Sequence, residues 1–341
     1  MPRYYSTCPA GLEPIVEQMA QEALPGFRLS RLLGGALIYD ADTAPSGADS
    51  PRCFANSYEL LAALPDMELG KALARLAADR AFTERANEAM ARYGFRSFRC
   101  MFSQYNQLTS VPAPLRARLE RQLTAARLDR LTPDTELLLL RRSEGMTLAL
   151  LRLTRRPATR QRVGKGELMP ELAQAMVFLT GPEARDVFMD PFCGHGALGV
   201  ERARSPYSQI MLFDIDQRMA DEARARLRGR KGTLIERRDA LELSGRVESA
   251  SVTAIVTDPP WGLFEPLPLP APEFYRRMLE EFARALVPGG RLVLLSADKQ
   301  ELEAAFRAQL SLELTIRHDI LVSGKKAAIY RAQKRANGGV R

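Results

Sequence analysis

The chain has 341 residues, of which 46% are hydrophobic and 26% charged, so it is long enough for two or three domains with sizeable cores. No apolar run approaches the roughly 20 residues that span a bilayer. The N-terminal stretch MPRYYSTCPAGLEP also lacks a hydrophobic signal region. These features argue against a membrane protein and favour a cytoplasmic one.

The net charge of +8 is unevenly distributed along the chain. Residues 71–165 carry 20 Lys and Arg against 8 Asp and Glu, a surplus of 12 that leaves the remainder at net −4. Such a basic section indicates a face that binds a polyanion such as nucleic acid. Basic side chains that merely solvate helices would give the same composition, so charge alone does not decide between the two.

The cysteines and histidines indicate no metal site. Cys8, Cys53, Cys100 and Cys193 form no CxxC pair, and the chain has only two histidines. We therefore expect reduced, structural thiols and no bound metal.

The first part of the chain predicts two small α+β regions, at residues 1–52 and 53–155, separated by the polar loop 41–51. In the first region we expect strand 3–8, helix 11–24 and strand 31–39. In the second we expect helices at 57–64 and 68–91, strand 95–102, a basic amphipathic helix 115–128, and a hairpin formed by 135–142 and 146–154.

A basic linker, residues 156–166, separates these regions from the rest of the chain. The stretch LTRRPATRQRVGKG has no acidic residue and is either a solvated connector or a strap along a phosphate backbone. Its candidate RNA-binding residues are Arg155, Arg156, Arg160, Arg162 and Lys165.

From residue 167 to the C-terminus, strands and helices alternate regularly. Strands are expected at 187–190, 209–214, 233–238, 251–257 and 291–296, and helices at 171–179, from 197, at 217–228 and at 273–287. This alternation predicts a doubly wound, mainly parallel α/β sheet. The segments 314–322 and 327–333, joined by SGKK, predict an antiparallel hairpin at its end.

The tetrapeptide Asp258-Pro259-Pro260-Trp261 directly follows the apolar run SVTAIVT, which is typical of a buried parallel strand. Two prolines end that strand, because neither can donate to a strand ladder. A carboxylate, two rigid carbonyls and an indole are thereby placed at the carboxyl end of a central strand, where open α/β sheets bind ligands.

A glycine loop lies upstream of this tetrapeptide. Gly194, Gly196 and Gly199 form G-x-G-x-x-G between a strand and a helix, and Asp214 follows about 20 residues later. This pattern matches the fingerprint of dinucleotide-binding enzymes, so a nicotinamide or flavin cofactor is one interpretation.

Three features favour S-adenosylmethionine instead. Asp190 ends the strand before the glycines, where it would repel a pyrophosphate but could bind the ammonium of a methionine moiety. A second acid, Asp239, follows the strand at 233–238, where it could bond the adenine amino group. The terminal antiparallel hairpin is also more typical of methyltransferases than of dehydrogenases.

The motifs DPFCGHG, FDID, RRDA, DPPWG and VPGGRLV occur in an order that resembles class I Rossmann-like methyltransferases. More narrowly, the chain resembles the THUMP-domain RNA guanine-N2 methyltransferases, through GLEPIVEQM (11–19), TELLLLRRSEGMTLALLRLT (135–154) and MPELAQAMVFLTG. The resemblance implies a ferredoxin-like N-terminal subdomain, a THUMP-like RNA-binding domain at 53–155 and a methyltransferase domain at 167–341.

The resemblance also implies roles for individual residues. Asp190, Gly194 and Gly196 would border the methionine and ribose of the cofactor, Asp214 would bind the ribose hydroxyls, and Asp239 and Ala240 would lie at the adenine. The cofactor-binding residues implied in full are Asp190, Phe192, Gly194, Gly196, Asp214, Ile215, Asp239 and Ala240. His195, where relatives often have Ser or Thr, is interpreted as a tolerated loop residue.

The catalytic residues implied are Asp258, Pro259, Pro260 and Trp261. Asp258 and the Pro259 carbonyl would orient the exocyclic amine of a guanine, and Trp261 would stack on the base. The predicted activity is methylation of a guanosine N2 in tRNA. A ribosomal RNA guanine, adenine N6 in DNA, a protein glutamine amide and a noncatalytic RNA-binding role stay open as alternatives.

Overall fold

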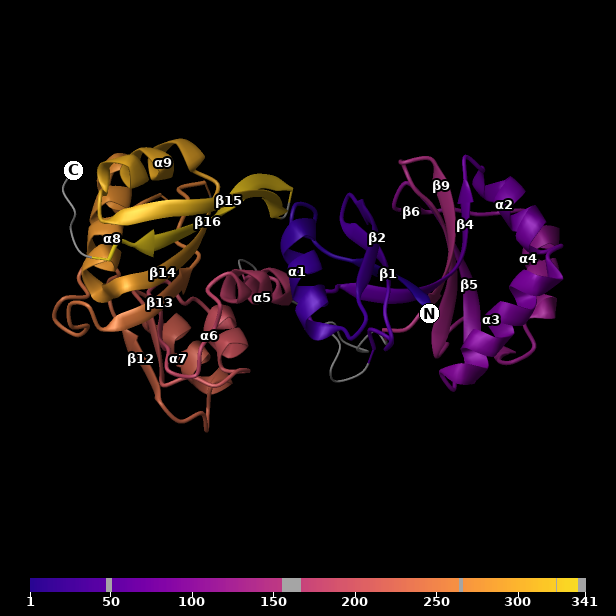
Figure 1. The fold of residues 1–341 in the computed structure, drawn as a ribbon, viewed down its shortest axis with the longest axis horizontal. Coiled ribbons are helices and arrows are strands. Elements are labelled where there is room, and N and C mark those ends of the chain that lie inside the picture. The colour runs from indigo at the N-terminus through magenta and orange to yellow at the C-terminus, as the bar shows by residue number, and fades with distance from the viewer. Residues whose placement is uncertain (47–50, 155–166, 264–265, 323, 337–341) are drawn as a thin grey trace. The chain divides into compact units, whose positions relative to one another are not determined.

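The computed structural model describes residues 1–46, 51–154, 167–263, 266–322 and 324–336. It divides into two compact units, which are described separately: unit 1 comprises Met1–Cys8 and Ala20–Gln161, and unit 2 comprises Pro9–Met19 and Arg162–Arg341. Figure 1 shows both units and labels most of their elements.

The elements up to residue 154 are β1 (Arg3–Thr7), α1 (Glu13–Ala23), β2 (Arg28–Leu33), β3 (Ala36–Asp40), β4 (Asn56–Pro65), α2 (Leu69–Leu76), α3 (Arg80–Arg92), β5 (Ser97–Gln104), β6 (Gln107–Leu108), α4 (Ala113–Gln122), β7 (Arg127–Leu128), β8 (Thr135–Arg141) and β9 (Met146–Arg152).

Those that follow are α5 (Pro170–Phe178), β10 (Val187–Asp190), α6 (Ala197–Arg202), β11 (Gln209–Asp214), α7 (Gln217–Arg226), β12 (Thr233–Arg237), β13 (Val252–Thr257), α8 (Ala271–Ala285), β14 (Leu286–Ser296), α9 (Lys299–Ala308), β15 (Leu312–Val322) and β16 (Lys325–Lys334).

A single sheet organises unit 1. Its nine strands follow the order β2-β3-β1-β4-β9-β8-β5-β6, with β7 paired to β5. Helices α2, α3 and α4 lie along one face of this sheet (Figure 1). Tyr5, Ile38, Leu148 and Leu150 form part of a buried cluster that both predicted N-terminal regions share. The sheet is therefore continuous across the predicted boundary near residue 52.

The predicted helix at 57–64 is wrong, because this segment forms the strand β4. Its sequence, SYELLAAL, is rich in good helix formers, and that local preference suggested a helix. In the structure β4 pairs with β1 on one side and β9 on the other, with Tyr58 opposite Arg152. Hydrogen bonding on both edges outweighs the intrinsic preference of the segment.

Three other predicted elements of unit 1 are each split in two. The helix expected at 115–128 is α4, which ends at Gln122, followed by the short strand β7. The strand expected at 31–39 is the hairpin of β2 and β3, which turns at Gly34-Gly35. The helix expected at 68–91 is α2 followed by α3, and Asp79 caps the start of α3 by accepting a hydrogen bond from the Phe82 amide. The hairpin expected at 135–142 and 146–154 is confirmed as β8 and β9.

Unit 2 confirms the predicted α/β sheet with a terminal hairpin. Its seven strands follow the order β12-β11-β10-β13-β14-β16-β15. The first five strands in this order, from β12 to β14, all pair in parallel with their neighbours. β16 pairs antiparallel with both β14 and β15. Met189, Ile255 and Leu292 from the strands pack with Phe274 and Phe282 of α8.

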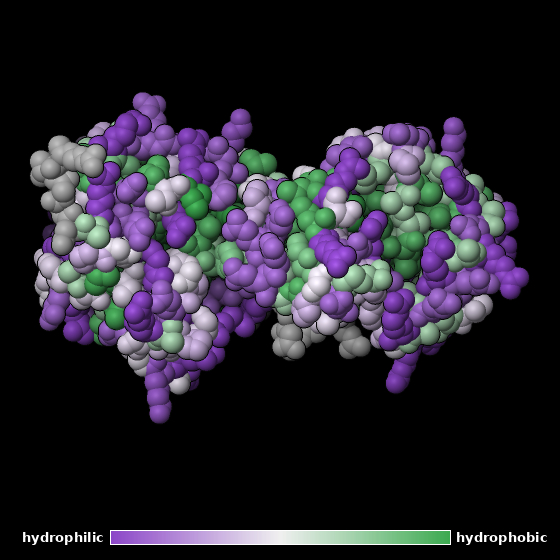
Figure 2. Space-filling model, viewed as in Figure 1, coloured by the Kyte–Doolittle hydropathy of each residue, from purple (hydrophilic) through white to green (hydrophobic). Residues whose placement is uncertain are grey.

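Hydrophilic side chains cover much of the visible surface of each unit (Figure 2). Among the helices that the structure describes, none is long and apolar enough to cross a membrane. The described residues also contain no group of His, Cys, Asp and Glu that could hold a metal ion.

Candidate active site

The carboxyl ends of four parallel strands in unit 2 present acidic residues at one edge of the sheet. Asp190 ends β10, Asp214 ends β11, Asp239 follows β12 and Asp258 follows β13. The strand order reverses between β10 and β13, since β11 and β12 continue on one side of β10 and β14 lies on the other side of β13. Ligands of open α/β sheets bind at such a switch point, so the sequence-predicted site residues converge where a ligand is expected.

The glycine loop after β10 has a conformation that requires its glycines. Gly194 and Gly196 have φ values of 47° and 80°, in the left-handed region that favours glycine. A Cβ on Gly196 would lie 2.9 Å from the Cβ of Ala223 on α7, so this glycine also allows a close approach of loop and helix. A Cβ on Gly194 would meet no atom within 4 Å, which shows that this side of the loop borders open space.

Asp190 is a buried carboxyl group with one unused oxygen. Its side chain is 1% exposed, and Oδ1 accepts hydrogen bonds from the Phe192 amide (3.2 Å) and the Thr257 hydroxyl (2.8 Å). Oδ2 has no partner among the described residues. Burial, with the nearby charges of Asp214 and Asp258, raises the pKa of Asp190 to about 8. A cationic group at Oδ2 would satisfy this oxygen and stabilise its charge.

The other predicted cofactor residues extend along the same edge. Asp214 accepts hydrogen bonds from the amides of Gly194 and Asp216, both at 2.9 Å. Ile215 is 62% exposed, which is unusual for so large an apolar side chain, and it offers a surface to a flat ring. Asp239 accepts a hydrogen bond from the Leu241 amide at 2.8 Å.

Two further predicted cofactor residues lie in packed surroundings. Phe192 is half-buried, and its ring centroid lies 6.1 Å from that of Phe274. Ala240 is 3% exposed.

His195 is more than a tolerated loop residue, because it joins the glycine loop to α7. Its Nδ1 lies 2.6 Å from Glu222 Oε2, and its carbonyl accepts a hydrogen bond from Arg226 Nη1 at 3.0 Å. Both partners are on α7, one turn apart. This pairing could not be predicted, because nothing in the loop sequence indicates which residues of the next helix face it.

Asp258 is held by the indole of Trp261. Trp261 Nε1 donates to Asp258 Oδ1 at 3.0 Å, and both side chains are half-buried. Burial raises the pKa of Asp258 to about 7, and the indole hydrogen bond opposes this rise. Within the described residues no other hydrogen bond to this carboxylate is found, so Oδ2 is available to a ligand. The prolines at 259 and 260 fix the backbone between the two side chains.

A cavity of about 470 Å³ lies beside Trp261. Its described lining residues are mostly apolar and come from the Pro-rich segment after β13 and from the end of β14: Trp261, Gly262, Leu263, Leu267, Leu269, Ala271, Ala297 and Asp298. The volume and the apolar walls suit a planar ring such as a nucleobase. Sequence reasoning missed Asp298, since residues at separate strand ends meet only in the folded sheet.

Thr257 was also missed as a site residue. It is fully buried, and its hydroxyl donates a hydrogen bond to Asp190 Oδ1. Thr257 therefore connects the strand that precedes Asp258 to the cofactor edge. The five residues predicted to bind RNA, Arg155, Arg156, Arg160, Arg162 and Lys165, lie outside the described residues.

Comparison with known proteins identifies the domain that carries this site. The family model of the RMKL-like methyltransferase domain, UPF0020, matches residues 157–326. The tRNA (guanine(10)-N2)-dimethyltransferase of Methanothermobacter thermautotrophicus is 33% identical over 160 residues, which are 46% of this chain and 46% of that protein. The enzyme of the same name from Methanocaldococcus jannaschii is 36% identical over 115 residues, 32% of each chain. The matches thus span about half of the relatives' length or less.

Solved structures share the fold over the whole chain. TrmN from Thermus thermophilus superposes with a TM-score of 0.76 at 22% identity, over 98% of this chain and 100% of that one. A predicted N6-adenine-specific DNA methylase from Listeria monocytogenes reaches 0.66 at 14% identity, over 97% and 95%. At these identities the likeness shows the fold alone. Residues 157–326 therefore match the RMKL-like methyltransferase domain, and the site described above lies within them.

Proposed function

We propose that this chain is an S-adenosylmethionine-dependent RNA methyltransferase that acts in the cytoplasm on the exocyclic N2 amine of a guanosine in tRNA. The observation that carries the proposal is the half-buried Asp258 carboxylate, held by Trp261 beside a base-sized cavity and next to the acid-lined sheet edge. The relatives named as tRNA (guanine(10)-N2)-dimethyltransferases support the choice of base and of RNA.

The cofactor edge fits S-adenosylmethionine better than a dinucleotide. The unpartnered Oδ2 of Asp190 suits the ammonium of the methionine moiety and would repel a pyrophosphate. In this proposal Asp214 binds the ribose hydroxyls, the exposed Ile215 packs against a face of the adenine, and Asp239 accepts from its amino group. When bound, the cofactor supplies a methyl group activated by the sulfonium.

Asp258 provides the chemistry on the substrate side. The lone pair of a guanine amine is delocalised into the ring, so the amine is a poor nucleophile. Asp258 Oδ2 and the Pro259 carbonyl can each accept a hydrogen bond from one N–H of the guanine amine. These two bonds orient the nitrogen and offset the positive charge that develops on it during methylation. With a pKa of about 7, Asp258 is also suited to accept the proton that the amine loses.

Trp261 serves the same site in two ways. One face of its ring is available for stacking on the base, which contributes on the order of 1–3 kcal/mol. Its indole N–H fixes the catalytic carboxylate at the same time. Reaching the amine of a paired guanine requires the base to leave the helix.

A basic surface on unit 1 supports an RNA substrate. Lys71 and Arg75 of α2 and Arg118 and Arg121 of α4 are exposed, and no ion pair to an acid is found for them within the described residues. The two helices are joined where Gln122 Nε2 donates to the Ala77 carbonyl at 2.7 Å. We call these four basic residues the α2/α4 basic surface. Hydrophilic side chains are visible over this part of unit 1 in Figure 2.

The test is methylation of unmodified tRNA by the purified chain, followed by nucleoside mass spectrometry. We expect N2-methylguanosine from the wild type, and no product from Asp258→Ala, which should still bind S-adenosylhomocysteine. Asp221→Ala, an exposed residue of α7 paired with Arg224, is the matched control and should keep full activity. Turnover by Asp258→Ala, or N6-methyladenosine as the product, would contradict the proposal. Ribosomal RNA offered in parallel separates the two RNA classes.

A further inference from the structure

The cavity beside Trp261 is lined by a charged residue, Asp298, at the same edge of the sheet as the catalytic carboxylate. β13 and β14 are parallel neighbours, with Thr257 opposite Leu294, so both strands end at the same edge of the sheet. Asp258 comes directly after β13, and Asp298 comes two residues after β14. Among the lining residues that the structure describes, Asp298 has the only ionisable side chain.

The Asp298 carboxylate is half-buried and retains free acceptor capacity. Oδ1 accepts a long hydrogen bond of 3.4 Å from the Glu301 amide at the start of α9, and no ion pair to Asp298 is found within the described residues. The neighbouring Lys299 does not neutralise it, because its ammonium binds Asp319 at 2.6 Å. The backbone here is fixed by the hydrogen bond from the Asp298 amide to Ser296 Oγ at 3.1 Å.

An ionised carboxylate only accepts hydrogen bonds, so it discriminates between purines at N1. In guanine, N1 is next to the exocyclic amine and carries a hydrogen. In adenine, N1 is also next to the exocyclic amine but presents a lone pair. An extruded base is read along its Watson–Crick edge. If its amine lies at Asp258, the next group along that edge is a hydrogen-bond donor in guanine and an acceptor in adenine.

We propose that Asp298 is a specificity-determining residue, which accepts the N1–H of the target base and thereby selects guanine over adenine. The inference rests on the proposed function, in which the cavity receives the target base. Asp298 binds the N1–H of guanine, whereas the N1 lone pair of adenine is repelled and leaves the carboxylate without its partner.

The chain carries its own reporter for this test, since Trp261 is its only tryptophan and lines the cavity. Quenching of its fluorescence is titrated with the monophosphates of guanosine, inosine and adenosine, with S-adenosylhomocysteine present. Inosine keeps the N1–H but lacks the amine, so it separates the contact with Asp298 from the contact with Asp258.

Asp298→Asn is the informative variant, because asparagine caps a helix as well as aspartate does and its amide can donate to adenine N1. Asp79→Asn is the matched control: Asp79 caps α3 in unit 1 by accepting from the Phe82 amide at 3.1 Å. We expect the wild type and the control to bind the guanosine and inosine nucleotides about tenfold or more tightly than the adenosine nucleotide, and Asp298→Asn to bind all three within about threefold.

Two results would overturn the inference: an unchanged preference in Asp298→Asn, or no quenching of Trp261 by any nucleotide in the wild type. Methylation of unmodified tRNA, measured in parallel, keeps the two proposals apart. Guanine methylation together with an unchanged preference in the variant contradicts only the role of Asp298. Selective nucleotide binding that Asp298→Asn abolishes, without any methylation of RNA, contradicts only the proposed activity.

Discussion

Replacing Trp261 by phenylalanine tests how the catalytic carboxylate is held. Phenylalanine keeps a ring that can stack on a base but lacks the indole N–H that donates to Asp258 at 3.0 Å. A hydrogen bond to a charged group contributes about 1.5–3 kcal/mol. Because both side chains are half-buried and water can partly replace the donor, we take the lower value, which corresponds to about one pH unit.

The sign of the effect follows from which form of Asp258 is active. The ionised form accepts the amine N–H bonds, and the indole hydrogen bond favours that form. Without it, the pKa of Asp258 rises from about 7 to about 8, and the ionised fraction at pH 7 falls about fivefold. We expect Trp261→Phe to lose about that factor in the rate at pH 7 while its rate on the alkaline plateau stays within about threefold of the wild type.

The assay is the initial rate of methyl transfer to unmodified tRNA over a range of pH on both sides of neutrality. Asp258→Asn serves as the control. It removes the titrating group, so the change of rate with pH near pH 7 should disappear in this variant. A uniform decrease at every pH would show that the indole acts only through stacking. An unchanged profile would refute the role of its hydrogen bond altogether.

Three further predictions concern the cofactor edge and the RNA surface. The pKa of Asp190 in the folded chain is about 8 against 3.8 ordinarily, so the stability of the fold falls as pH rises between these values. Asp190→Asn should therefore raise the melting temperature more at pH 8 than at pH 5. The same variant should show no binding of S-adenosylhomocysteine in calorimetry. Gly196→Ala should destabilise the chain to urea by about 1–2 kcal/mol more than Gly229→Ala, because the two have φ values of 80° and 81° but only the first meets a neighbouring side chain. Changing Arg75 and Arg118 together to Gln should weaken RNA binding for all sequences. It should also reduce the slope of log affinity against log salt concentration by about 1.4–1.8, measured by filter binding at several salt concentrations. Equal melting shifts at the two pH values, equal losses for the two glycines, or an unchanged salt dependence would contradict the respective prediction.

The C-terminal site was largely predictable because its signals are local. The run before Asp258 is continuously apolar and is followed by two prolines, and the acids at 190, 214 and 239 each lie at the end of an expected strand. In a parallel sheet these strand ends meet at one edge, so the convergence follows from the order of the elements. Contacts between strand ends and neighbouring loops or helices, such as His195 with Glu222, leave no comparable mark on the sequence.

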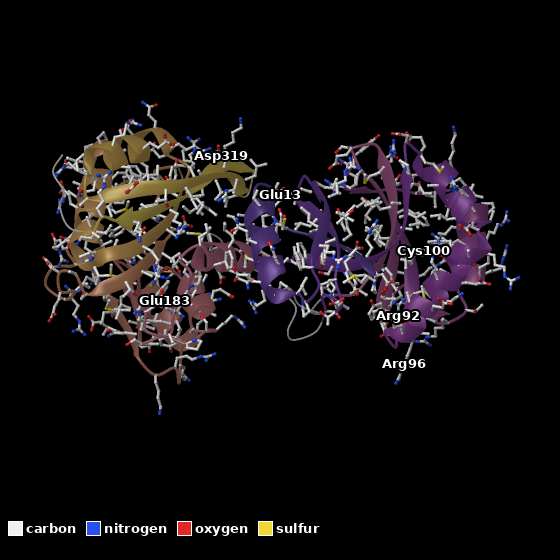
Figure 3. All side chains as sticks on the ribbon, in the orientation of Figure 1. Glu13, Arg92, Arg96, Cys100, Glu183 and Asp319 are labelled. Atoms are coloured by element: carbon white, nitrogen blue, oxygen red, sulfur yellow. The ribbon has the colours of Figure 1, made fainter. Side chains whose placement is uncertain are left out.

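The N-terminal half was less predictable for two physical reasons. β4 has a helix-favouring sequence, and only pairing on both of its edges makes it a strand. The basic surplus also mixes surface and interior. Arg141 and Arg152, for example, are buried and paired with Glu68 and Glu136. Composition cannot separate such residues from exposed ones such as Arg96, which extends away from unit 1 in Figure 3.

The three acids at the switch point share one electrostatic environment. The charges of Asp214 and Asp258 both raise the pKa of Asp190, so this buried carboxyl group ionises less readily beside them. A cation bound at Asp190 favours the ionised form of this carboxyl group, so binding of the cofactor is expected to release a proton from Asp190 near neutral pH.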